Sequence, residues 1–302
     1  QAAVRWTQFL QKHSKDKRLP AAHLNLGVCR FGDHKFPEAA AVFRDVLAKY
    51  GEFEQRDRAQ FNLGMCYYNM SLAMQDKADA AKTEAEHKTV QAAAAVEFRK
   101  AAVEFDKLVK GFAKSVQLVD ALFYQAECLS LAGDLAAAVS VYDRIVKQHA
   151  QAPQTVDAYY GLGIAYAELA QHENAAKKFD EFVKKFPKDE RLDECRLRNG
   201  AALTGLERHA DAEKLYQQVQ SVATSPYAEY ALYQLALCVQ AQDKLPQAAD
   251  LFESLPKRFP KGPYFGSALL SGGKCRFRAE QFPQAATDFT QVIARKDAGA
   301  DE

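Results

Sequence analysis

Glycine and proline are scarce in this chain. Its 302 residues include 15 glycines and 10 prolines, while 48% of the residues are hydrophobic. A sheet-rich chain would need more of both, because tight turns between strands depend on them. The composition therefore favours an all-helical chain with ample apolar side chains to bury.

Two further absences concern membranes and nucleic acids. No apolar stretch approaches the ~18–20 residues that a membrane-spanning helix needs. The formal net charge is only +1, and charged stretches such as 15–18 and 184–191 mix both signs. Mixed charge is typical of a solvated surface rather than of a nucleic-acid-binding patch. We therefore expect no membrane span and no nucleic-acid partner.

Motifs for catalysis and metal binding are also missing. The sequence has no Gly-rich phosphate loop, no nucleophile elbow and no His-Glu-x-x-His run. No two of the seven histidines share a helical turn, and no cysteine pair has metal-ligand spacing. We predict a protein that is not an enzyme, with no catalytic residue, cofactor or metal, although a metal site formed between repeats stays open.

What the chain does have is a small residue that recurs at a fixed period. Successive positions are 37, 62, 37, 37, 36 and 37 residues apart, so one repeat carries about 25 extra residues. A period of this size predicts a solenoid of stacked helical hairpins. The seven positions are Gly27, Gly64, Ala126, Gly163, Gly200, Ala236 and Gly273.

The second helix of each expected hairpin has a pattern of its own. Small residues open it, and bulky residues follow three or four positions apart, as in the segment 175–186. This spacing places the bulky side chains on one face of a helix. Two of these helices end in Phe-Pro, at Phe186-Pro187 and Phe259-Pro260. The residue before a proline is pushed out of the helical region, so the pair ends the helix.

The beginning of the chain fits the same register. Trp6 aligns with Phe179, so residues 1–18 are interpreted as a second helix whose first helix is missing. The chain would then be a fragment of a longer protein, or would open on an atypical capping helix. We expect a single solenoid over 1–296, with this half-repeat followed by about seven hairpins, and a tail at 297–302.

The extra residues of the second repeat, 71–95, lie between its two helices. They are rich in alanine and contain no Gly or Pro, which favours helix. We predict two lengthened helices that form a hairpin projecting about 15–18 Å beyond its neighbours, at 1.5 Å per residue.

The hairpin signature, the small residue at the eighth position of the first helix and the Ala-then-aromatic second helix resemble the tetratricopeptide repeat family. The resemblance covers nearly the whole chain and implies an all-α, right-handed superhelical solenoid. The period of 36–37 residues, against 34 in the usual repeat, together with the Phe-Pro pairs that close second helices, resembles a bacterial cell-envelope branch. That branch includes the periplasmic Tol–Pal-associated repeat proteins and the outer-membrane assembly lipoproteins. This likeness implies the periplasm or cell envelope, with the cytoplasm left open.

The resemblance also implies where a partner would bind. In this family the fifth, ninth and twelfth positions of each first helix face the concave groove. Chaperone-binding members hold a carboxylate there with Lys and Asn, but Asn25 and Asn62 lack the accompanying lysines. An apolar strip is typical of a protein contact, and the alternative is that these side chains pack against the next repeat. The candidate protein-binding residues are Leu24, Val28, Phe31, Phe61, Met65, Tyr68, Phe123, Tyr160 and Tyr233.

Five of the six cysteines occupy one position of the repeat, two residues after the small residue. We interpret them as buried packing residues without disulfides, since equivalent positions of stacked hairpins are too far apart to bridge. They are Cys29, Cys66, Cys128, Cys238 and Cys275. Cys195 falls elsewhere in its repeat and is the candidate for an exposed thiol.

The leading hypothesis is a non-catalytic scaffold that binds a partner protein or peptide in a concave groove. One alternative is a segment of a self-associating cell-envelope assembly protein. Another is an array that targets or regulates a larger enzyme. Whether the groove or the 71–95 insertion is the binding element stays open.

Overall fold

The computed structural model describes residues 1–294, and this part of the chain contains fifteen α-helices and no strand. The predicted all-α superhelical repeat fold is confirmed. The expected tail at 297–302 lies outside the described residues.

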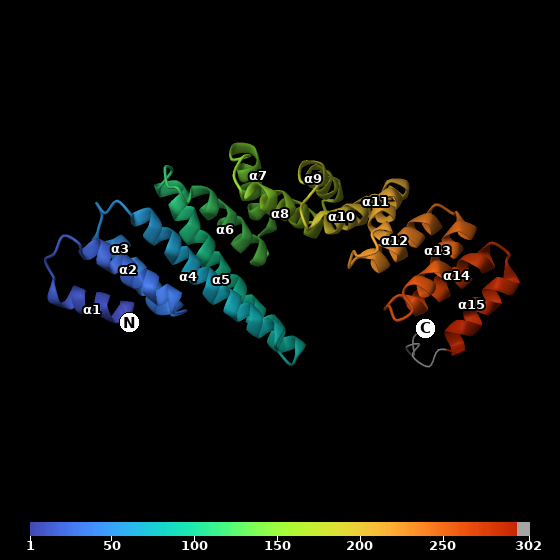
Figure 1. Ribbon diagram of the computed structural model, residues 1–302, viewed down its shortest axis with the longest axis horizontal. Helices are drawn as coiled ribbons and strands as arrows, with labels where there is room; N and C mark the ends of the chain where they lie inside the picture. Colours follow the sequence, from blue (N-terminus) through green and yellow to red (C-terminus); the bar gives the residue numbers. More distant parts are fainter. Residues whose placement is uncertain (295–302) are drawn as a thin grey trace. The chain divides into compact units, whose positions relative to one another are not determined.

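The chain divides into two compact units, Gln1–Leu169 and a second unit from Ala170 onward, and Figure 1 labels their helices. The helices of unit 1 are α1 (Ala2–Lys12), α2 (Leu19–Gly32), α3 (Phe36–Lys49), α4 (Arg56–Asp79), α5 (Glu84–Gly111), α6 (Leu118–Leu131), α7 (Leu135–Gln148) and α8 (Thr155–Glu168). Those of unit 2 are α9 (His172–Lys185), α10 (Leu192–Gly205), α11 (His209–Ser221), α12 (Ala228–Ala241), α13 (Leu245–Arg258), α14 (Phe265–Arg278) and α15 (Phe282–Ala294).

The turn between the two helices of a hairpin recurs with the same backbone conformation. After α2, His34 has a φ of 57°, and Lys35 donates its backbone N–H to the Arg30 carbonyl. This hydrogen bond reaches from one residue to the carbonyl five positions earlier, as in the Schellman motif that commonly ends helices. The left-handed residue follows the period of the repeat, at His34, Gly133, Ala170, Glu207, Asp243 and Glu280. Most of these residues are not glycine, so the hydrogen bonds of the motif hold the turn despite the steric cost of a Cβ.

Four hairpins close around a contact between the small residue, here Gly27, Gly64, Gly200 or Gly273, and an aromatic ring of the second helix. A Cβ added to Gly27 would lie 2.5 Å from the Phe43 ring, and one added to Gly64 would lie 2.7 Å from Phe105. Such distances are far below ordinary van der Waals contact, so the two helices approach closely at this point. An aromatic residue holds this second-helix position in every hairpin, at Phe43, Phe105, Tyr142, Phe179, Tyr216, Phe252 and Phe289.

The second hairpin of unit 1 is much longer than the others. Helix α4 has 24 residues and α5 has 28, whereas most helices of the chain have 14. Ten to fourteen extra residues add about 15–21 Å at 1.5 Å per residue, and Figure 1 shows the pair extending past α6. Fully buried small residues, Ser71, Ala78 and Ala94, let the two helices pack closely along this extension.

Candidate functional site

The sequence-predicted groove residues fall into several separate sets. Leu24 is only 1% exposed and packs with Phe43, Val46 and Leu63 in the core of the first two hairpins. Leu24 is therefore a core residue that packs against neighbouring helices, and it does not line an open groove. Val28 and Phe31 are half-buried and pack against the same cluster. The position of a side chain in the repeat could not predict this, because burial depends on how closely the next hairpin approaches.

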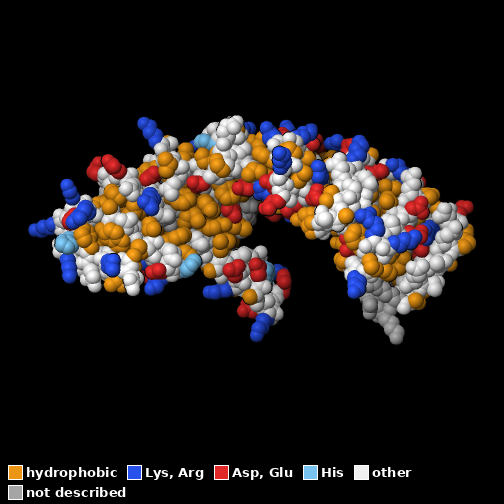
Figure 2. Space-filling model, viewed as in Figure 1, with side chains coloured by type: hydrophobic (Ala, Val, Ile, Leu, Met, Phe, Trp, Pro, Cys, Tyr) orange, Lys and Arg blue, Asp and Glu red, His pale blue; other side chains and the backbone are white. Residues whose placement is uncertain are grey.

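The structure brings four other predicted residues together on α4 and α6. Phe61, Met65 and Tyr68 on α4, and Phe123 on α6, are half-buried and pack against the core cluster of α5–α7. This set is called the α4–α6 surface below. Figure 2 shows hydrophobic side chains gathered over the region of α4, α5 and α6.

The last two predicted residues lie apart from this surface. Tyr160 is half-buried on α8. Tyr233 on α12 in unit 2 stacks on Tyr264, with ring centroids 4.9 Å apart, and contacts Phe252 at 5.8 Å. Tyr233 therefore belongs to a local aromatic cluster of unit 2.

A carboxylate completes the α4–α6 surface. Glu127 on α6 is half-buried, and the Tyr68 hydroxyl on α4 donates a hydrogen bond to its Oε1 at 3.0 Å. Tyr124, one turn before Glu127, meets the Tyr68 ring edge-on with centroids 5.3 Å apart. The hydrogen bond and the ring contact both join α4 to α6, and the hydrogen bond holds the Glu127 carboxylate beside Tyr68.

The surroundings of Glu127 shift the pKa values of the groups on this surface. Burial raises the pKa of Glu127, the Tyr68 hydrogen bond lowers it, and the charge of Asp157 raises it again. Burial also raises the pKa of Tyr68 and of Tyr124, and the charge of Glu127 adds to both shifts. At neutral pH both tyrosines are therefore hydrogen-bond donors.

Glu127 was not among the sequence-predicted site residues. A signal for it was present, since the ninth position of the first helix is apolar in most hairpins, as at Val28, Met65 and Ile164. A carboxylate at this mostly apolar position marks α6 as different from the other first helices. Its tyrosine donor lies 59 residues away along the chain, so the sequence could not reveal the pair.

The cysteines of the chain are mostly inaccessible. All six are free thiols, and five of them are buried. Cys195, expected to be exposed, is 0% exposed, so that expectation was wrong. It lies in the first turn of α10, and burial raises its pKa to about 12. Cys29 is the thiol with partial exposure.

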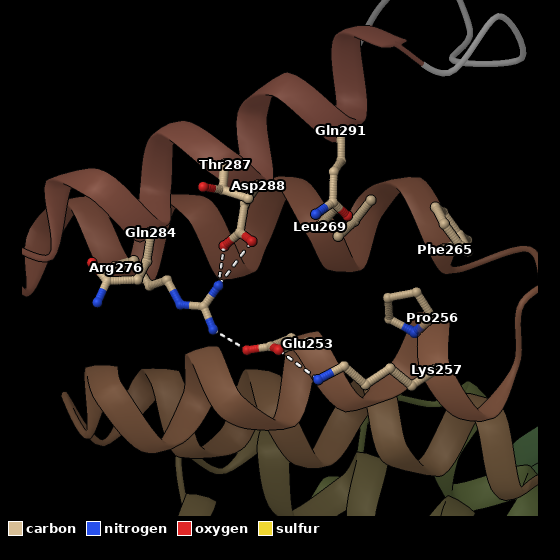
Figure 3. Close-up of a pocket in the computed structure, with 10 residues that line it drawn as sticks. All are labelled: Glu253, Pro256, Lys257, Phe265, Leu269, Arg276, Gln284, Thr287, Asp288 and Gln291. Carbon is tan, nitrogen blue, oxygen red and sulfur yellow. Dashed lines mark hydrogen bonds and ion pairs between the residues drawn. The ribbon is translucent and has the colours of Figure 1, made fainter.

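A cavity of about 440 Å³ between α13 and the last hairpin of unit 2 is lined by an ion network whose central pair, Arg276 and Asp288, is buried (Figure 3). The Arg276 guanidinium, 8% exposed, donates to both oxygens of Asp288 at 2.8 and 2.7 Å and also to Glu253. Lys257 pairs with Glu253 at 2.5 Å. These charges satisfy one another, so the network joins α13, α14 and α15 rather than offering a free charge to a ligand.

Two more properties of the described residues bear on function. Within residues 1–294, no group of three or more His, Cys, Asp or Glu side chains is placed to hold a metal ion. No helix in that range is both long and apolar enough to cross a membrane.

Comparison with known protein families identifies repeats in the chain. Family models of the tetratricopeptide repeat match residues 91–153, 132–190 and 230–262. The matched segments of the chain are tetratricopeptide repeats. The matched segments include α6 and therefore Glu127 and Tyr124 of the α4–α6 surface.

Solved tetratricopeptide repeat structures share the fold of the chain. The C-terminal part of a repeat-containing protein from Cytophaga hutchinsonii aligns with a TM-score of 0.64 at 14% identity, covering 92% of this chain and 97% of that one. A tetratricopeptide repeat protein from Parabacteroides merdae aligns with a TM-score of 0.52 at 14% identity, over 92% and 94%. YrrB, described as having an unusual peptide-binding site, aligns with a TM-score of 0.52 at 19% identity, over 67% and 95%. No curated protein sequence matches the chain significantly.

Proposed function

We propose that this chain is a non-catalytic scaffold that binds a segment of a partner protein on the first helices of its hairpins. The observation that carries the proposal is the α4–α6 surface. Phe61, Met65, Tyr68 and Phe123 remain partly accessible there although the core packs beneath them. Large half-buried aromatic side chains are the type that dominates binding energy in protein interfaces.

Two further facts support this function. Tetratricopeptide repeats commonly serve as protein-binding scaffolds, and one structurally similar protein, YrrB, is described as binding peptide. Membership of the cell-envelope branch, and with it a periplasmic location, remains a prediction from the 36–37-residue period and the Phe-Pro helix ends.

Site-specific photo-crosslinking tests the proposal without removing the aromatic residues. A photoreactive phenylalanine derivative replaces Met65 on α4 in one variant and Val103 in the other. Val103 lies on the second helix α5 of the same hairpin and is 51% exposed. We expect the probe at position 65 to capture a discrete partner from native extract, and the matched probe at position 103 to capture none.

Equal capture from both positions, or capture only at position 103, would contradict binding on the first helices. Circular dichroism of both variants confirms that the helices are intact before the comparison is made.

A further inference from the structure

The first helices α6 and α8 carry acidic charge only. Each has two carboxylates and no Lys, Arg or His: Asp120 and Glu127 on α6, Asp157 and Glu168 on α8. The second helix between them, α7, is mixed instead, and pairs Asp143 with Lys147 at 2.6 Å. First helices of this composition attract cationic groups and repel anionic ones.

Among these carboxylates, Glu127 is the one that is hydrogen-bonded to an aromatic residue of the α4–α6 surface. Its hydrogen-bond partner in the described part of the chain is the Tyr68 hydroxyl at 3.0 Å, and no Lys, Arg or His is among the groups that shift its pKa. A half-buried carboxylate without a cation is held at a cost in free energy. A cation supplied from outside would offset that cost.

The rings beside Glu127 suit an organic cation. Tyr68 and Tyr124 meet edge-on at 5.3 Å, and Phe123 meets Tyr124 at 5.5 Å. Aromatic faces attract ammonium and guanidinium groups, and they also pack against the alkyl chains that carry these groups. A metal ion fits poorly, because it needs several oxygen ligands and no such group lies within residues 1–294.

We propose that Glu127 anchors a binding site for a Lys or Arg side chain of a partner protein segment, with the alkyl chain packed against Tyr68 and Tyr124. The inference rests on the proposed function, because it assigns a chemistry to the same first-helix surface. The occupant follows from charge complementarity: the acidic α6 and α8 select a basic segment over an acidic one.

Selection from a library of short random peptides tests the site. The wild-type protein is compared with Glu127→Gln, which keeps the size and hydrogen-bonding capacity of the side chain but removes its charge. Asp143→Asn on α7 is the matched control. We expect Lys and Arg to be enriched about two- to fivefold in peptides recovered by the wild type, the range for a cation beside aromatic rings at a partly exposed site. Asp143→Asn should keep this enrichment, and Glu127→Gln should lose it while still recovering peptides.

A second measurement needs no substitution in the protein. An enriched arginine peptide is compared with the same peptide carrying citrulline, which has nearly the same shape but no charge. The wild-type protein should bind the arginine form about two- to fivefold more tightly.

The outcomes separate this inference from the proposed function. Peptides recovered without a Lys or Arg preference, or with a preference that Glu127→Gln keeps, would overturn the cationic site and leave peptide binding standing. Recovery of no peptide at all would overturn both. Recovery of acidic peptides would reverse the assigned chemistry.

Discussion

The Phe43 ring occupies the space that a Cβ on Gly27 would need, with a ring carbon 2.5 Å from the Cβ position. Phe43 is itself 0% exposed, so its ring has little room to move aside. This contact sets the close approach of α2 and α3, and its equivalents recur through the chain.

Replacing Gly27 with a residue that has a side chain should therefore destabilise the first hairpin, and a larger side chain should destabilise it more. Gly27→Val should lower the free energy of unfolding by about 2–3 kcal/mol, because overpacking forces the buried ring from its position. Gly27→Ala should cost less, since better helix propensity offsets part of the strain by about 1 kcal/mol, and Ala126 and Ala236 hold this position in other hairpins.

Thermal unfolding followed by circular dichroism measures both changes. Gly51→Val is the control, because a Cβ at Gly51 would meet no atom within 4 Å. A Gly27→Val variant as stable as the Gly51→Val variant would show that the ring contact does not limit the helix approach.

Breaking the buried ion pair of unit 2 should be costly. Arg276→Met leaves the Asp288 carboxylate, 5% exposed, without its cation, and we expect a loss of about 3–5 kcal/mol. Replacing both partners, as Arg276→Met with Asp288→Leu, should restore most of the loss because no buried charge remains.

Chemical denaturation of the single and double variants checks this. Arg278→Met provides the exposed control, since Arg278 and Asp243 are 54% and 77% exposed and such pairs contribute at most about 1 kcal/mol. Equal losses for Arg276→Met and Arg278→Met would contradict a special role for the buried pair.

Glu127 should make stability depend on pH. Burial raises its pKa in the folded protein above the ordinary value of 4.5, so the folded state binds the proton more tightly than the unfolded state does. Stability then falls as the pH rises from 4.5 through the folded pKa, and Glu127→Gln removes this loss. We expect Glu127→Gln to be more stable than the wild type at neutral pH, with a difference that shrinks as the pH falls toward 4.5.

Thermal midpoints of both proteins across this pH range measure the effect. The neighbouring groups are the Tyr68 hydroxyl and Asp157, and neither tyrosine titrates there because the pKa values of Tyr68 and Tyr124 are raised. A difference between the proteins that stays constant with pH would argue against a raised pKa at Glu127.

The end of the long hairpin should open locally. Thr83 caps α5 by accepting a hydrogen bond from the Glu86 backbone N–H at 3.2 Å, and His87 contacts the Ala78 carbonyl at 2.8 Å. Thr83→Ala should weaken this end by about 1 kcal/mol and speed amide hydrogen exchange near residues 80–90. Thr89→Ala is the control, because the Thr89 hydroxyl bonds only to Ala85 one turn back in α5. Faster exchange across all of α4 and α5 would mean that the extension does not unfold separately.

Local sequence patterns were enough to predict much of the fold. The small residue and the aromatic residue of the second helix recur every 36–37 residues, apart from the long second repeat, and in four hairpins they form one close helix contact. The period can therefore be read without the structure. The free thiols at the shared cysteine position follow from the same register. Phe-Pro pairs mark helix ends for an equally local reason, the restriction that proline places on the residue before it.

The sequence by itself determined the helical hairpins, their period and the residues that close each one, because these depend on spacing along a single hairpin. Only the tertiary structure decided which side chains stay accessible. Leu24 is buried because it packs with side chains of α3 and α4, and Cys195 is also fully buried, although the register of both residues alone allowed exposure. The pairing of Tyr68 with Glu127 likewise arises where α4 and α6 come together in space, and contacts between hairpins depend on packing distances that no local pattern records.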